Sequence, residues 1–91
     1  MYIDFMYKDG MSGYNLIIYS EGVCNSYKVD SVDIATNIIT NLHDLSNKNI
    51  YIDTLGIGIA LGDKLKELGI LYKPTTIIYR DLNTVRTCKG R

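Results

Sequence analysis

One stretch in the middle of the chain, residues 49–69, constrains the fold most strongly. It opens with a short β-branched and aromatic run at 50–52, which predicts a strand. Asp53 follows, then two glycines, and then a helical pattern that ends at Gly69, a residue suited to the left-handed position after a helix. The apolar residues of this helix recur at three- and four-residue spacing: Ile57, Ala60, Leu61, Leu65 and Leu68. Open α/β sheets place their chemistry at the carboxyl end of such a strand.

The acid and the glycines of this stretch form a recognisable motif. The run DTLGIG at 53–58, followed by Asp63, Leu65 and a terminal Leu-Gly pair, resembles the second-carboxylate segment of the nuclease domain of phage terminase large subunits, within the RNase H-like superfamily. In that family a first carboxylate lies on the opening strand, and Asp4 in the run YIDF matches it. The resemblance implies a phage or other viral protein whose chain corresponds to a truncated form of that nuclease domain.

The rest of the chain supplies further strands. Strand-like runs at 2–7, 14–20 and 23–29 are separated by glycine-containing turns and predict a three-stranded antiparallel meander. A β-branched run at 75–79 predicts the last strand. We therefore expect an α/β (α+β) fold, an RNase H-like mixed sheet of order βββαβαβ with helices packed on the sheet. Because 91 residues suffice for only one modest core, we expect a single compact RNase H-like domain over residues 1–91.

A second amphipathic pattern lies between the meander and the central strand. Asp30 or Ser31 is the expected N-cap of this helix. Its predicted apolar stripe consists of Ile34, Ala35, Ile38, Ile39, Leu42 and Leu45. His43, the only histidine, lies beside the polar face without a second histidine or a nearby cysteine, and we expect a surface residue rather than a metal ligand.

Composition narrows the class of protein. Hydrophobic residues make up 46% and charged residues 22% of the chain, as in soluble globular proteins, and no apolar run is long enough to span a membrane. We therefore expect a protein of the host-cell cytoplasm.

Cys24 and Cys88 lie far apart without metal-ligand spacing, which favours free thiols over a disulfide. Ten basic residues balance ten acidic ones, and this balance argues against strong non-specific binding of nucleic acid.

Two carboxylates carry the strongest chemical signal. If the resemblance extends to the fold, Asp4 and Asp53 lie on neighbouring central strands and form a metal site for Mg²⁺ or Mn²⁺, hard ions that prefer oxygen ligands. Such ions clamp the attacking and leaving oxygens of a phosphodiester, so these residues, with Asp81 as a third candidate, are the expected catalytic residues of a nuclease. The family takes further acidic ligands from a C-terminal helix that no segment of these 91 residues matches. We therefore expect a scaffold used for binding, without a cofactor unless the carboxylate pair still holds its metal.

The glycines allow a separate interpretation. Gly56, Gly58 and Gly62 could form a phosphate cradle at a helix N-terminus, which would suit a nucleotide-binding module. Their spacing differs from the known phosphate-binding fingerprints. The alternative is that they only permit a tight turn from strand to helix and close packing.

Three functions from different classes follow from these patterns. The first is a small phage or mobile-element protein that acts as a binding or inhibitory, anti-defence module on a host protein, nucleotide or nucleic acid through a tyrosine-rich surface; the chain has eight tyrosines. The second is a metal-dependent phosphodiesterase or nuclease that uses Asp4 and Asp53. The third is the nucleotide-binding module. A sheet with helices on one face also leaves an edge or face to cover, which favours a homodimer.

Overall fold

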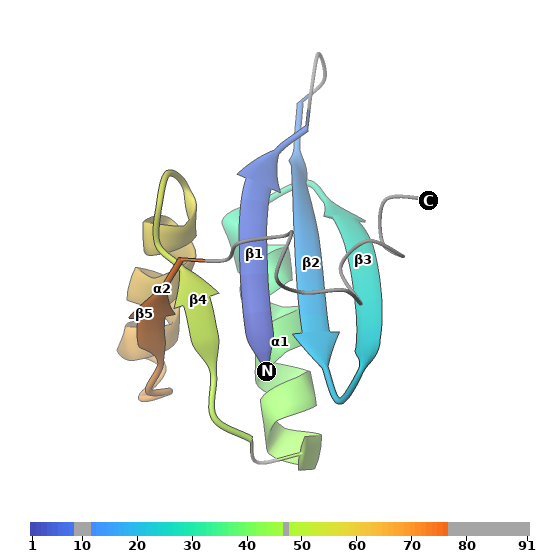
Figure 1. Ribbon diagram of the computed structural model, residues 1–91. Coiled ribbons are helices and arrows are strands. Elements are labelled where there is room, and N and C mark those ends of the chain that lie inside the picture. The colour runs from blue at the N-terminus through green and yellow to red at the C-terminus, as the bar shows by residue number, and fades with distance from the viewer. Residues whose placement is uncertain (9–11, 47, 77–91) are drawn as a thin grey trace.

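The computed structural model describes residues 1–8, 12–46 and 48–76. These residues form a five-stranded sheet and two helices (Figure 1). In chain order the elements are β1 (Tyr2–Tyr7), β2 (Tyr14–Ser20), β3 (Val23–Val29), α1 (Val32–Ser46), β4 (Tyr51–Asp53), α2 (Gly58–Glu67) and β5 (Lys73–Thr75). The predicted order βββαβαβ is therefore confirmed.

The strand β1 lies in the middle of the sheet, whose strand order is β3-β2-β1-β4-β5. It pairs antiparallel with β2 and parallel with β4, while β2 pairs antiparallel with β3 and β4 parallel with β5. The expected mixed α/β sheet is confirmed, and the three strands of the meander have the predicted bounds. The last strand begins earlier than the predicted run at 75–79, of which residues 77–79 lie outside the described part of the chain.

Both helices cover the same face of the sheet, behind the strands in Figure 1. Because side chains alternate along a strand, every second residue of the central strands faces these helices, and those in the middle of β1 and β2 are buried. The core is aliphatic apart from one phenylalanine, and its members are Ile3, Phe5, Leu16, Ile18, Val29, Ala35, Ile39, Ile50, Ile52, Leu61 and Leu65. Full burial of side chains of this size contributes about 1.5–3 kcal/mol each, and this term holds the helices on the sheet.

The helix α1 begins as predicted but buries a narrower stripe. Ser31 caps it, because its Oγ accepts a hydrogen bond from the N–H of Ile34 at 3.2 Å. Ile34 and Leu45, which the sequence places in the apolar stripe, are 43% and 86% exposed. In their place Thr36 is buried, and its hydroxyl donates to the carbonyl of Val32 at 2.8 Å, which satisfies the polar group inside the helix.

The helix α2 ends at the predicted glycine. Gly69 has φ +77°, and the N–H of Ile70 donates to the carbonyl of Leu65 at 2.9 Å, the reverse bond of a glycine-terminated helix. Leu68, which the sequence places in the apolar stripe, is the C-cap residue of this helix and is 58% exposed.

The free-thiol expectation is wrong for Cys24, which lies on β3 and is disulfide-bonded. Spacing along the sequence contains no information on which residues approach one another across the fold, so the pattern could not reveal this bond. Cys88 lies outside the described residues.

Candidate functional site

The candidate site lies on the face of the sheet opposite the helices, which we call the distal face. On β1 the buried residues Ile3 and Phe5 point toward the helices, so Tyr2, Asp4 and Met6 belong to the distal face. Tyr2, Asp4, Tyr19, Tyr51 and Asp53 lie on this face of the central strands, whereas the buried core residues lie on the other face. The chemistry of the chain is therefore concentrated on the distal face.

The structure brings the two predicted carboxylates together on this face. The parallel pairing of β1 with β4 matches Ile3 with Ile52, so the next position along both strands sets Asp4 beside Asp53. Asp53 is only 8% exposed and Asp4 is partly buried. Burial, and after it the negative charge of Asp53, raise the pKa of the Asp4 carboxyl to about 6. Two neighbouring carboxylates in a partly buried position place negative charge close together, and a cation would neutralise this charge.

The turn after β4 fixes the position of Asp53. Its Oδ1 accepts a hydrogen bond from the backbone N–H of Leu55 at 3.0 Å. On the other side, the backbone of α2 packs directly on the strand end, because a Cβ at Gly58 would overlap the carbonyl oxygen of Asp53. Gly56 has φ +71°, which only glycine adopts readily, so the turn brings the helix back immediately. The glycine motif thus holds the acid in place at the strand end.

Three tyrosines and a lysine form a continuous row across the distal face, which we call the tyrosine row. The strand registers match Tyr19 with Tyr2, Tyr2 with Tyr51, and Tyr51 with Lys73. The rings of Tyr2 and Tyr51 are stacked with centroids 4.8 Å apart, and those of Tyr2 and Tyr19 are tilted at 6.4 Å. The Nζ of Lys73 lies 5.9 Å from the centre of the Tyr51 ring, within the range of a cation–π contact.

A second row lies next to the tyrosine row and contains the carboxylates. The same registers place Ile17 beside Asp4, and Asp53 beside Thr75. The two rows are two residues apart along each strand, which is about 7 Å at the usual rise of a strand. The sequence pattern did not reveal Lys73, because it assigns the segment before residue 75 to a connection. It places Thr75 in the last strand but does not assign this residue to the site.

The remaining predicted site residues have different environments. Gly62 lies inside α2, where a Cβ would come within 2.5 Å of the ring of Tyr72, so its small size permits helix packing. This packing role agrees with the simpler interpretation of the glycines. The phosphate cradle formed by Gly56, Gly58 and Gly62 stays a prediction.

Asp81 lies outside the described residues. In residues 1–8, 12–46 and 48–76, no cluster of three or more His, Cys, Asp or Glu side chains could hold a metal.

The histidine is less exposed than we expected. His43 is half-buried, and its Nδ1 atom is buried without a hydrogen-bond partner in the described part of the chain. Its position on the helix-covered side separates it from the two carboxylates of the distal face. It therefore does not contribute to the candidate site.

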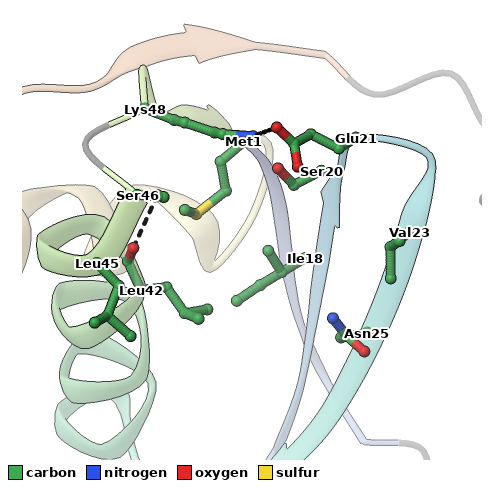
Figure 2. A pocket seen from close by; sticks show the side chains of 10 residues that line it. All are labelled: Met1, Ile18, Ser20, Glu21, Val23, Asn25, Leu42, Leu45, Ser46 and Lys48. Carbon is green, nitrogen blue, oxygen red and sulfur yellow. Dashed lines mark hydrogen bonds and ion pairs between the residues drawn. The ribbon is translucent and has the colours of Figure 1, made fainter.

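A pocket of about 350 Å³ lies on the helix-covered side, between the end of α1 and the β2–β3 hairpin (Figure 2). Its floor is apolar, with Ile18 and Leu42 facing each other. At its rim Lys48 forms an ion pair with Glu21, which lowers the pKa of the Glu21 carboxyl. The charged groups at the rim are thus paired with each other above an aliphatic floor.

Comparisons with known proteins give no family for this chain: no family model, curated protein or solved structure matches it. None of the helices in the described residues is long and apolar enough to cross a membrane. The geometry of the distal face is therefore what indicates a function for this chain.

Proposed function

We propose that the chain is an RNase H-like domain that binds Mg²⁺ or Mn²⁺ at Asp4 and Asp53 and uses this site to hydrolyse phosphodiester bonds of nucleic acid. One observation carries the proposal, namely that the two acids are neighbours on the central parallel strands β1 and β4. The strand order and the resemblance of the 53–58 motif to the second-carboxylate segment of phage terminase nucleases support it.

The residues present fit a divalent cation. Both candidate ligands are carboxylates, which hard cations prefer, and their mutual repulsion is relieved when a cation is bound. The Leu55 N–H keeps one oxygen of Asp53 oriented, so that the side chain is positioned before any ligand arrives. A bound ion would supply Lewis-acid chemistry, which polarises the phosphate and activates water. Thr75, beside Asp53, adds a hydroxyl at the edge of the site.

Protons compete with the cation at this site. Because the pKa of Asp4 is raised to about 6, the carboxyl carries a proton in mildly acidic solution and must lose it to bind metal. We therefore expect metal binding and cleavage to weaken as the pH falls through 6, well above the pH at which an ordinary aspartate would protonate.

Cleavage of labelled single- and double-stranded DNA and RNA tests the proposal, with Mn²⁺ or Mg²⁺ and with EDTA. We expect metal-dependent cleavage by the wild-type chain and its loss in Asp53→Asn. The matched control is Asp63→Asn, which removes one exposed carboxylate from α2 and should leave cleavage unchanged. A protein that cleaves none of the four substrates with either ion contradicts the nuclease proposal.

A second candidate is the binding module expected first from the sequence, a non-catalytic anti-defence protein acting on a host protein, nucleotide or nucleic acid. It is favoured because the described residues bring two carboxylates together without a third metal ligand. This candidate predicts binding of metal without cleavage, and a partner recovered in stoichiometric amounts when the chain is used as bait in host lysate. Cleavage that depends on Asp53 would count against it.

A further inference from the structure

The tyrosine row and the carboxylate pair lie side by side on one sheet face, and this arrangement suggests what kind of substrate crosses it. Tyr2 is 37% exposed, Tyr19 and Tyr51 are partly exposed, and Lys73 is exposed. The row crosses four adjacent strands, from β2 to β5, without an interruption in register. It therefore forms a continuous aromatic surface that ends in a positive charge.

We infer that the tyrosine row binds a single strand of nucleic acid and aligns its backbone beside Asp4 and Asp53. This inference rests on the proposed function and names its substrate class. The aromatic rings offer stacked or edge-to-face contacts to unpaired bases. The Lys73 ammonium and the hydroxyls of Tyr2 and Tyr51 are donors of the kinds that contact phosphate oxygens.

The low positive charge of this surface favours a single strand over a duplex as its ligand. Duplex binding depends mainly on several Lys and Arg residues that neutralise phosphates. The row contains only one lysine, and the whole chain has a formal net charge of zero. Affinity must therefore come from aromatic contacts with bases, which a duplex hides in its stack but a single strand presents.

The neighbouring carboxylates make binding depend on metal. Without a cation, Asp4 and Asp53 repel a phosphate that lies about 7 Å from the tyrosine row. A bound divalent ion would reverse this repulsion. We therefore expect a short single strand to bind more tightly in Mn²⁺ than in EDTA, whereas the contacts to the row persist in both conditions.

The test measures fluorescence anisotropy of a labelled twelve-nucleotide single strand and of its duplex, at low salt with Mn²⁺, while the integrity of the strands is checked on a gel. We expect Tyr2→Thr to weaken single-strand binding by about 10-fold, the effect of losing one base contact. Lys73→Gln should weaken it by about threefold and reduce the slope of log K against log salt by about 0.7, as for one phosphate contact.

Two matched controls separate the row from general effects. Tyr7→Thr removes an exposed tyrosine from the opposite face of the same strand. Lys66→Gln removes a lysine that lies 5.4 Å from the ring of Tyr72 on the helix side, a contact of the same kind as that of Lys73 with Tyr51. Both controls should bind the single strand as the wild type does.

The outcomes distinguish this inference from the proposed function. If only the row variants lose affinity for the single strand, and the wild type prefers the single strand to the duplex, the tyrosine row binds single strands as inferred. Equal effects of row and control variants, tighter duplex binding, or no binding by the wild type overturn it. If Asp53→Asn abolishes cleavage while the row variants bind normally, the inference that the tyrosine row binds a single strand is wrong and the nuclease proposal stands. If the row variants lose binding but the wild type cleaves nothing, the inference about the tyrosine row stands and the nuclease proposal fails. Should Tyr2→Thr fail to fold, Lys73→Gln decides.

Discussion

Replacing Asp4 by Asn should stabilise the metal-free protein at neutral and alkaline pH. The pKa of this carboxyl rises from its ordinary value of 3.8 to about 6 in the folded chain, first through burial and second through the charge of Asp53. At about 1.4 kcal/mol per pH unit, the rise corresponds to about 3 kcal/mol. Asp4 keeps some contact with solvent, which screens part of this effect, so we expect a gain of about 1–3 kcal/mol in Asp4→Asn.

The sign of the pH dependence follows from which state binds the proton more tightly. The folded state holds the Asp4 proton more tightly than the unfolded chain, so this group favours folding below pH 4. That contribution is lost as the pH rises through 6. The difference in free energy of unfolding between Asp4→Asn and wild type should thus be close to zero at pH 4 and largest above pH 7.

Urea unfolding followed by circular dichroism, in EDTA at pH values from 4 to 8, measures this difference. A gain of about 2 kcal/mol corresponds to a rise in Tm of about 8–16 °C for a domain of this size. The exposed Asp63→Asn is the control and should change stability by less than about 0.5 kcal/mol at every pH. An Asp4→Asn variant no more stable than wild type at pH 8 would refute the reasoning that burial and the charge of Asp53 disfavour the ionised Asp4 carboxyl.

Three further predictions concern the fold that holds the site. Gly58→Ala should destabilise the protein by about 2–4 kcal/mol in urea unfolding, because its Cβ would overlap the carbonyl oxygen of Asp53; a stability equal to wild type would contradict this packing. Ser31→Ala should cost about 1 kcal/mol through loss of the N-cap, measured in the same way, and no loss would mean that the cap bond is not formed. Ile39→Ala should lower the free energy of unfolding by about 2–5 kcal/mol, because this side chain is fully buried. Leu45→Ala, at an 86% exposed position, should change it by less than about 0.5 kcal/mol. Equal losses of stability in the two variants would contradict the assigned face of α1.

The element order could be predicted because it depends on local patterns, whereas the carboxylate pair was predicted from the resemblance to a known family. Alternation fixed the three strands of the meander, and the glycine after α2 marked the helix end, since both signals come from neighbouring residues. The placement of Asp4 beside Asp53 was expected from the resemblance alone, and the parallel pairing of their strands in the structure agrees with it. Their role as ligands or catalytic groups stays a prediction.

The features that the sequence could not reveal depend on how distant segments meet. The tyrosine row requires the registers of four strands, which are set by the packed core and not by any one segment. The exposure of Ile34 and Leu45 depends on where α1 crosses the sheet, because a helical stripe shows only which residues share a face. Cys24 likewise joins a disulfide that spacing does not predict.

The most direct test of the central claim is isothermal titration of Mn²⁺ into wild type and into the double variant Asp4→Asn/Asp53→Asn at pH 8. If the neighbouring carboxylates form a cation site, the wild type binds Mn²⁺ with a saturable heat, the double variant does not, and the control Asp63→Asn binds as the wild type does. Absence of Mn²⁺ binding by the wild type, or equal binding by the double variant, would contradict the account and assign the distal face to contacts that need no metal.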